Sequence, residues 1–384
     1  MSVLGLDFGT HSASIAIWYE DKCFWEVLAD DLGLRAIPCV VAFRGEENIV
    51  GQSALSQQHK NSSNTFSGIR NYLLKHEKTH VNVPLLERDL TVQEINTIFF
   101  RNIHNQVKQQ VGKAVREAVV TTPGPLDEDT KKRYVEAAQQ GGIRIKSFLD
   151  DASAALLAYG LDDPTVTPSK TVVVDIGWSR STVSVFSVSG GMFVPLASQA
   201  VEGISGSIFV KLLADFCAKE FTRKHKVPVQ ESAKAMLRLS RECEDAVKAL
   251  STGAEASINI DSLCEGVDYS TKISRARFED LIAIPLIHFK TAVAAVLAEA
   301  KVSADQVNRV CLSGGPSSVP RLIATLKMLL PHAVFPKVRF ETFEAQCIGA
   351  VLHGKHLLEL VRAYKNNEDV AIALRLSCLR YFLL

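Results

Sequence analysis

Apolar residues alternate with small or polar ones on both sides of a short polar tetrad near the start of the chain. Residues 3–17 read VLGLDFGTHSASIAI, in which two apolar runs flank Asp7-Phe8-Gly9-Thr10. Such alternation predicts a β-hairpin, and a glycine in its turn lets the backbone approach a ligand because glycine carries no Cβ. The pattern suits either an ordinary polar turn or a turn that presents N–H groups to phosphate and a carboxylate to a divalent cation.

A second copy of this pattern favours the ligand-binding interpretation. Residues 171–185, TVVVDIGWSRSTVSV, repeat the acid and the glycine as Asp175 and Gly177 within the same apolar frame. Ordered matches at a near-constant offset indicate a duplicated unit. We therefore expect two similar α/β lobes that face one another, with both acid-glycine turns pointing into a cleft between them. Two further pairs of segments follow in the same order: 118–123 with 310–315, and 151–160 with 344–354.

The remaining periodicity predicts strands and helices in both halves of the chain. Residues 60–90 are polar and are expected to be irregular, and the second lobe is expected to begin near Lys170. The expected strands are the hairpin at 3–19 and segments 24–28, 36–43, 117–121, 256–260 and 309–312. The expected helices are 51–59, 91–111, 209–226, 231–250 and 277–299.

Composition narrows the class of protein. The chain has 384 residues, of which 47% are hydrophobic and 22% charged, as in globular proteins with two or more domains. The net charge of +1 predicts neither direct nucleic-acid binding nor a membrane partner. The eight scattered cysteines form no C-x-x-C pair, which favours reduced thiols and a cytoplasmic protein. We expect no signal peptide and no membrane span.

Five segments together resemble the ATPase domain of the 70-kDa heat-shock chaperone family, over roughly residues 3–354. They are GLDFGTHS, VVDIG, DASAALLAYGL, residues 256–281 and LSGGPSSVP. Residues 256–281 are the most specific, since sugar kinases and actins share the acid-glycine turns but not this segment. The resemblance implies a duplicated actin-like (ribonuclease H-like) ATPase fold of class α/β, with two lobes around a nucleotide cleft that binds ATP and Mg²⁺.

The resemblance also implies a division of the chain. Lobe I is expected to cover 1–169 and lobe II 170–343, and a helix at 344–365 is expected to close lobe I. Ordinary family members continue past this domain into a peptide-binding region, whereas the resemblance here covers nearly the whole chain. We therefore expect no peptide-binding domain in this chain. The outer subdomains and the tail are expected as follows: 39–111 in lobe I, 206–282 in lobe II, and 366–384 as an apolar tail that is a linker, a docking segment or a truncated terminus.

The resemblance assigns roles to individual residues of this sequence. Metal contacts fall on Asp7 and Asp175. Catalytic roles fall on Arg70, Asp151 and Asp175. Contacts to the nucleotide fall on the two phosphate loops, on a helix of the adenosine pocket and on a turn beneath it: Gly9, Thr10, His11, Gly177, Gly206, Glu244, Lys248, Gly314 and Gly315. Glu244 and Lys248 also suit a simple surface ion pair at i, i+4.

Several of these positions depart from the family pattern. Trp178, Ser179 and Arg180 replace two glycines and a threonine of the second phosphate loop, and Arg70 stands in the segment where the family has a catalytic lysine. Arginine differs from lysine at a phosphate because its charge is spread over a planar fork. Asp151 replaces a glutamate and is one methylene shorter. Since phosphoryl transfer depends on positioning and charge, we expect ATP binding with weak or no hydrolysis.

Within the family, residues 34–55 and the helix at 151–160 resemble the atypical member of the ribosome-associated complex. That likeness implies a partner subunit in cotranslational protein folding, with a zuotin-type J-domain protein, the ribosome and other chaperones as partners. Three alternatives stay open: an active ATP-hydrolysing chaperone, a nucleotide-exchange factor resembling the 110-kDa relatives, and a nucleotide-free scaffold.

Overall fold

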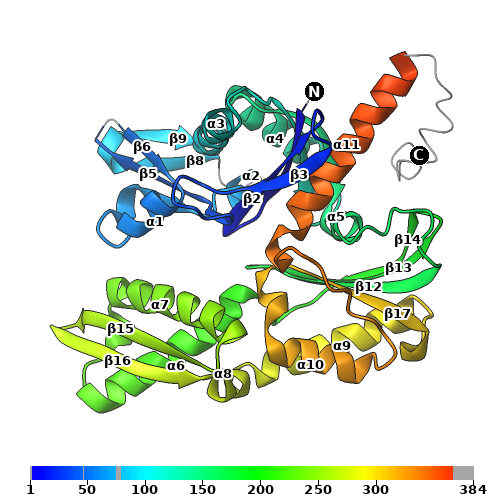
Figure 1. Ribbon diagram of the computed structural model, residues 1–384. Coiled ribbons are helices and arrows are strands. Elements are labelled where there is room, and N and C mark those ends of the chain that lie inside the picture. The colour runs from blue at the N-terminus through cyan, green and yellow to red at the C-terminus, as the bar shows by residue number, and fades with distance from the viewer. Residues whose placement is uncertain (1, 46, 75–78, 366–384) are drawn as a thin grey trace.

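A computed structural model describes residues 2–45, 47–74 and 79–365. The chain forms two lobes, each built on its own sheet, with lobe I above lobe II in Figure 1. The fold class inferred from the resemblance is confirmed, since both lobes are mixed α/β units of the actin-like type. The exact domain boundaries stay a prediction, and the apolar tail expected at 366–384 lies outside the described residues.

Lobe I contains a sheet with the strand order β11-β10-β1-β2-β3, to which β4 adds by pairing with β2. β1 and β2 form the predicted hairpin, in which Asp7 is paired with Ser14. β10 runs parallel to β1, and β11 runs parallel to β10. The bounds are β1 Ser2–Phe8, β2 Ser12–Tyr19, β3 Phe24–Leu28, β4 Ile37–Pro38, β10 Glu117–Thr122 and β11 Arg144–Asp150.

Lobe II repeats this arrangement with the order β14-β13-β12-β17. A parallel bridge between Arg309 and Val334 lies where lobe I has its fifth strand. The two hairpin turns also match in detail, because Gly9 N–H donates to Ser12 O at 3.0 Å and Gly177 N–H to Arg180 O at 2.9 Å. The strands are β12 Ser169–Ile176, β13 Ser181–Ser189, β14 Met192–Ala200 and β17 Val307–Ser313.

Helices α5 (Asp151–Ala158) and α11 (Ala345–Lys365) pack against each other beside the two sheets (Figure 1). Glycine makes this contact possible. A Cβ added to Gly5 of β1 would lie 2.2 Å from the carbonyl oxygen of Cys347, and one added to Gly349 would lie 1.8 Å from that of Ala154. The backbone of α11 therefore rests directly on β1 and on α5.

The outer part of lobe I corrects one expectation, because residues 60–74 and 79–90 are not irregular. They contain short strands and a short helix. Each of these elements is too short to show a helical or strand period in the sequence. The predicted long helix is confirmed as α3 (Val92–Val111), which begins at a capping box formed by Thr91 and Glu94. The other outer elements are β5 Val40–Arg44, β6 Glu47–Val50, α1 Gln52–Gln57, β7 Thr65–Ser67, α2 Arg70–Leu74, β8 His80–Val83, β9 Arg88–Thr91 and α4 Glu128–Gln140.

In lobe II the helix expected at 277–299 is two helices, α8 (Arg275–Leu281) and α9 (Ala283–Glu299), which meet at an angle of 62°. Pro285 explains the break, because proline suits the first turn of a helix and not its interior.

Within the described residues no single helix is long and apolar enough to span a membrane, and α8 and α9 reach that length only when they are taken together. The other elements are α6 Gly206–His225, α7 Ala233–Thr252, β15 Glu255–Cys264, β16 Val267–Ser274 and α10 Pro320–Leu329.

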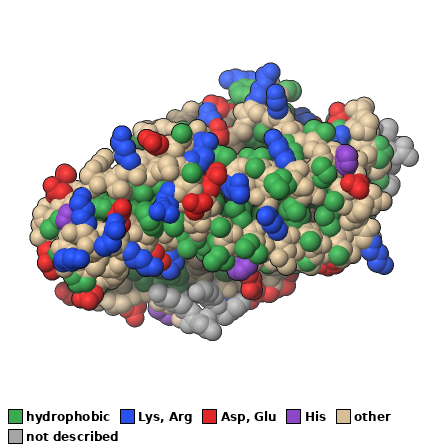
Figure 2. Space-filling view, turned by 90° about the horizontal axis from the view of Figure 1, so that it is seen from below, with side chains coloured by type: hydrophobic (Ala, Val, Ile, Leu, Met, Phe, Trp, Pro, Cys, Tyr) green, Lys and Arg blue, Asp and Glu red, His purple; other side chains and the backbone are tan. Residues whose placement is uncertain are grey.

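The lower face of lobe II carries hydrophobic side chains interspersed with Lys and Arg (Figure 2). Ile284 and Ile287 of α9 are 66% and 58% exposed, and Met328 of α10 is 79% exposed. The cysteines of the described chain are free, as expected; five of them are buried, whereas Cys23 is exposed.

The core of lobe I reaches the first hairpin turn. Phe8, which directly follows Asp7, is fully buried and stacks on Phe99 of α3 with ring centroids 5.2 Å apart. It also meets the edge of Phe100 at 5.2 Å and of Tyr134 at 6.1 Å. This packing fixes the end of β1, so the carboxylate of Asp7 is held at the mouth of the cleft between the lobes.

Candidate functional site

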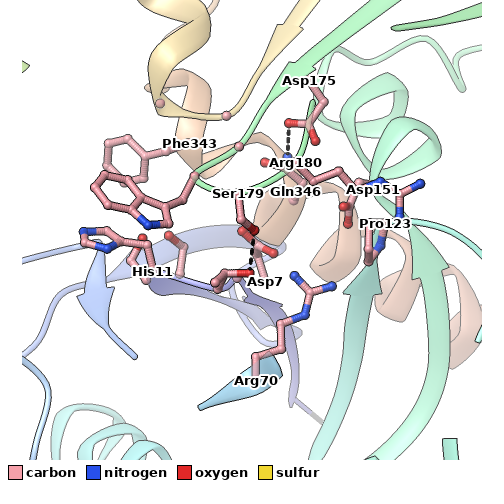
Figure 3. Close-up of a pocket in the computed structure, with 18 of the residues that line it drawn as sticks. Asp7, His11, Arg70, Pro123, Asp151, Asp175, Ser179, Arg180, Phe343 and Gln346 are labelled. Atoms are coloured by element: carbon pink, nitrogen blue, oxygen red, sulfur yellow. Dashed lines mark hydrogen bonds between the residues drawn. The ribbon is translucent and has the colours of Figure 1, made fainter. Parts of the chain in front are cut away.

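A cavity of about 310 Å³ lies between the lobes, at the ends of β1 and β12 (Figure 3). Residues of both lobes line it, including both acid-glycine turns. Ten of the residues assigned by resemblance come together here: Asp7, Gly9, Thr10, His11, Arg70, Asp151, Asp175, Gly177, Gly314 and Gly315.

Three carboxylates approach one another in this cavity, those of the buried Asp175 and the half-buried Asp7 and Asp151. Asp7 accepts a hydrogen bond of 2.9 Å from Thr121 Oγ1, and Asp175 accepts one of 2.9 Å from Gln346 Nε2. Burial raises the pKa of Asp7, and burial together with the charge of Asp7 raises the pKa of Asp175 to about 6. Burial and the charges of Asp175 and Asp7 hold the pKa of Asp151 well above its usual range. The three acids therefore disfavour one another's ionisation.

Two arginines, Arg180 and Arg70, line this cavity, and Arg70 faces the acids (Figure 3). Its Nε donates to the hydroxyl of Tyr134 at 3.0 Å, whereas its buried Nη2 has no hydrogen-bond partner among the described residues. Burial alone would lower the pKa of Arg70, but Tyr134, Asp151 and Asp7 together raise it. A buried guanidinium with an open donor is suited to an anionic ligand such as phosphate.

The residues of the cavity fit a divalent cation that arrives with phosphate. Mg²⁺ retains water and phosphate oxygens as ligands and uses few protein carboxylates. The described residues hold no cluster of three or more Asp, Glu, His or Cys placed to bind a metal ion by themselves. A cation accompanied by phosphate would relieve the repulsion among Asp7, Asp151 and Asp175, and the open Nη2 of Arg70 would meet the phosphate.

The turn after β17 lies very close to the second acid. Gly314 has φ +78°, and a Cβ there would lie 2.2 Å from Ile176 O and 2.9 Å from Asp175 Oδ1. Only glycine fits this position, because a side chain would be strained and would also overlap the strand. The Gly314-Gly315 turn therefore forms a wall of the cavity around Asp175.

Trp178, which departs from the family pattern, lies at the centre of the cleft. Its ring stacks on His11, with centroids 3.9 Å apart and planes inclined by 20°. The neighbouring Ser179 donates from its hydroxyl to Thr10 Oγ1 at 3.0 Å (Figure 3). The second loop therefore contacts the first one directly through side chains.

Three residues assigned by resemblance lie outside the lining of this cavity. The N–H of Gly206 donates to Gly177 O at 2.9 Å, so it supports the second loop from behind. Glu244 lines a separate cavity of about 350 Å³, and its Oε1 lies 2.8 Å from His11 Nε2. Lys248 Nζ lies 2.5 Å from Glu244 Oε1, in the i, i+4 pair that the sequence also allowed.

Sequence reasoning missed two residues that shape the site. Tyr134 on α4 orients Arg70, and Gln346 on α11 bonds Asp175. Tyr134 gave no signal, because an aromatic residue in an amphipathic helix is ordinarily a core residue. Gln346 lies two positions after Glu344, the residue matched to Asp151, so the duplication could have indicated it.

Comparisons with known proteins agree with this geometry. A profile described as "Hsp70 protein" matches residues 3–75 and 71–362. Heat shock 70 kDa protein 14-A of Xenopus laevis is 30% identical over 86% of this chain and 70% of that protein. Ribosome-associated complex subunit SSZ1 of Saccharomyces cerevisiae is 31% identical over 86% of this chain and 66% of that protein.

The match to a Heat shock 70 kDa protein of Neurospora crassa has 29% identity over 83% of this chain, and it spans about half of that relative, 53% of its length. The family profile nevertheless covers almost the entire described fold. The chain therefore belongs to the Hsp70 family, and its two lobes form the actin-like ATPase domain of that family.

Proposed function

We propose that this domain binds Mg²⁺-ATP between its lobes, hydrolyses it weakly or not at all, and acts as a partner subunit in cotranslational protein folding. The observation that carries the proposal is the cavity in which the open donor of Arg70 faces the carboxylates of Asp7, Asp151 and Asp175. Membership of the Hsp70 family supports nucleotide binding in general.

In this proposal each lobe contributes one acid and one glycine turn to the phosphates. Asp7 and Asp175 would hold the cation, which needs few protein carboxylates when it arrives with phosphate. Gly9 and Gly177 let the two turns approach phosphate oxygens, and Arg70 donates from Nη2. Mg²⁺-ATP, when bound, supplies the transferable phosphoryl group.

Weak hydrolysis follows from the state of the candidate catalytic residues. Asp151 is one methylene shorter than the glutamate of the family, so its carboxylate reaches less far toward an attacking water. Arg70 is held by Tyr134 through Nε and presents a planar fork in the region where the family has a compact ammonium group. Both features affect turnover more than binding.

The partner role is supported by similarity to a protein that is named a subunit of the ribosome-associated complex. We propose a zuotin-type J-domain protein as the direct partner, in contact with the ribosome and other chaperones in the cytoplasm. The net charge of +1 favours an indirect ribosome contact, because rRNA binding normally uses a basic face. The exposed Ile284 and Ile287 offer apolar surface for a subunit contact.

One experiment separates the alternatives. The protein is titrated with labelled ATP in the presence of Mg²⁺, and product formation is then followed in the same sample. Saturable, Mg²⁺-dependent binding with little product is the expected result. Rapid turnover would favour the active chaperone, and absence of binding at millimolar ATP would favour the scaffold.

A second experiment addresses the partner. The protein is captured from cytosol and sedimented through a sucrose gradient. We expect it to sediment with a J-domain protein and with ribosomes. If a high-salt wash removes the J-domain protein, the ribosome contact should be lost with it. Recovery as a lone monomer would favour the exchange-factor or scaffold alternatives.

A further inference from the structure

Three side chains connect the lobes across the middle of the cleft. His11 Nε2 of lobe I lies 2.8 Å from Glu244 Oε1 on α7 of lobe II, and the His11 ring stacks on Trp178 of the second loop at 3.9 Å. Glu244 is only 14% exposed. One lobe I residue thus meets two separate elements of lobe II, so these contacts resist separation of the lobes.

These contacts also divide the cleft into two parts. The cavity with the carboxylates and the second cavity of about 350 Å³ share Thr10, His11 and Trp178 as a common wall. The second cavity is bounded by α1 of lobe I and α7 of lobe II, with side chains that include Leu55 and Leu237. His11 and Trp178 therefore form a partition between the acids and the adenosine-pocket helix.

The Trp178 ring also fills space beside the start of α6. A Cβ placed on Gly206 would lie 3.2 Å from Trp178 Cε3 and 3.0 Å from Pro316 Cγ. The indole is therefore packed near the Gly314-Gly315 turn and Gly206, which the resemblance assigns to the nucleotide. In this structure the Trp178 side chain therefore occupies space that a bound nucleoside would need.

We propose that His11, Trp178 and Glu244 form a latch that holds the two lobes together, and that a nucleotide must open this latch before its nucleoside can be seated. The proposal rests on the nucleotide site proposed above. A nucleotide joins phosphates to a base through a ribose, so it must pass between the phosphate loops and α7. The contact of His11 with Glu244 closes that passage.

Neighbouring groups allow the latch to open and close reversibly. Lys248 also contacts Glu244, at 2.5 Å, so the carboxylate keeps one cationic partner when His11 leaves. Although burial alone would raise it, the pKa of Glu244 is lowered to about 2 by His11 and Lys248. A further bond, from Arg241 Nη1 to Leu55 O at 2.7 Å, joins the same two lobes and supports the closed position.

The first test needs no nucleotide. His11→Ala, Glu244→Gln and the double variant are unfolded in urea, and their midpoints are compared. In a latch the double variant loses clearly less than the sum of the two single losses, because both changes remove the same contact. The matched control pairs His11→Ala with Asp215→Ala on the outer surface of α6, where losses should add. Additive losses for His11 and Glu244 would overturn the latch. If His11→Ala does not fold, His11→Asn replaces it.

The second test reports on Trp178 directly. Trp18 and Trp25 are changed to Phe, which leaves Trp178 as the single tryptophan of the chain. Mg²⁺-ATP should change its fluorescence, whereas Mg²⁺-tripolyphosphate, which has no nucleoside, should raise the melting temperature without that change. An equal fluorescence response to both, or a response to neither despite ATP binding, would overturn the opening of the latch.

The third test measures how much the closed latch weakens ATP binding. Trp178→Ala should tighten ATP binding several-fold or more and leave tripolyphosphate binding unchanged, because a closed fraction lowers the apparent affinity only for the ligand that needs the open form. Unchanged or weaker ATP binding would overturn the proposal. If no variant binds either compound while the His11 and Glu244 losses stay non-additive, the proposed nucleotide function fails and the bracing contact between the lobes stands.

Discussion

Arg70 donates from Nε to the hydroxyl of Tyr134 at 3.0 Å, although the two residues lie 64 positions apart in the chain. This bond holds one edge of the guanidinium against the core of lobe I. The other edge is left to face Asp7 and Asp151, whose charges raise the pKa of Arg70. Tyr134, which contacts no predicted ligand, therefore orients the Arg70 guanidinium toward the acids of the site.

Removing that hydroxyl should destabilise the protein. Tyr134→Phe leaves the buried Nε of Arg70 without its partner, which costs about 1–3 kcal/mol in the free energy of unfolding. Urea denaturation measures the loss. Tyr364→Phe on the 73% exposed Tyr364 of α11 is the matched control and should leave stability nearly unchanged. Equal midpoints for Tyr134→Phe and the unmodified protein would contradict the role of the bond.

The acids predict an unusual dependence of stability on pH. The pKa of Asp175 is about 6 in the folded chain, above the ~3.9 of an unfolded aspartate. The folded state thus binds more protons between these values, so stability is highest below pH ~4 with respect to this group and falls as pH rises through 6. Asp175→Asn should flatten this fall and raise stability at pH 7, by at most about 3 kcal/mol, because one pKa unit corresponds to about 1.4 kcal/mol.

Urea midpoints from pH 4.5 to 7.5 give the measurement for that prediction. Asp215→Asn, on the surface of α6, is the control for loss of one carboxylate. A lower midpoint for Asp175→Asn than for the unmodified protein at pH 7 would show that the carboxylate is stabilised in the fold, against the expectation.

The glycine turn offers a matched pair of substitutions. Gly314 and Gly112 have similar φ values, +78° and +72°, but only Gly314 has atoms close to the position of a Cβ. Gly112 is left-handed helical with ψ 1°, where alanine costs about 1–2 kcal/mol, whereas Gly314 has ψ 144°, close to a region that is almost restricted to glycine. Gly314→Ala should lose clearly more stability than Gly112→Ala, because its methyl group also overlaps Ile176 O. Similar losses in thermal denaturation would mean that the turn relaxes freely.

Nucleotide binding should raise the melting temperature, since a ligand that binds only the folded state stabilises it by mass action. Asp7→Ala together with Gly314→Arg should abolish the shift that Mg²⁺-ATP produces. The double variant is compared with the unmodified protein at millimolar ATP, with and without Mg²⁺. An unchanged melting temperature of the unmodified protein at millimolar Mg²⁺-ATP would contradict nucleotide binding.

Restoring the groups of the family should increase turnover. Arg70→Lys with Trp178→Gly, Ser179→Gly and Arg180→Thr returns a compact cation and small residues to the phosphates. ATP hydrolysis by this variant should exceed that of the natural chain in a phosphate-release assay. The same variant with Asp151→Ala is the control and should lose the gain. A natural chain that already hydrolyses ATP as fast as its relatives would contradict the expectation.

The sequence was sufficient to predict the elements that repeat. Alternation around Asp7 and Asp175, with a glycine two residues later in each case, is a local signal, and the structure places both turns in one cavity. The strand and helix pattern also predicted α3, whose capping box is local. These features depend on residues close together in the chain.

Contacts between distant residues could not be predicted in this way. His11 and Glu244 are separated by 233 positions, and their contact depends on how lobe I meets lobe II. Hydrogen bonding by Gln346 and Tyr134 likewise depends on packing of α11 and α4. The break between α8 and α9 is local, but Pro285 lies where a continuous apolar pattern hides it.

The first turn of α11 touches both lobes at once. Gln346 is hydrogen bonded to Asp175 of lobe II, while the next residue, Cys347, lies against Gly5 of lobe I with no room for a side chain between them. Beyond this turn α11 is packed along β1 and β2 of lobe I, and Arg362 near its far end pairs with Glu20. The helix therefore moves with lobe I, and a rotation of lobe II against it would strain the bond between Gln346 and Asp175 first.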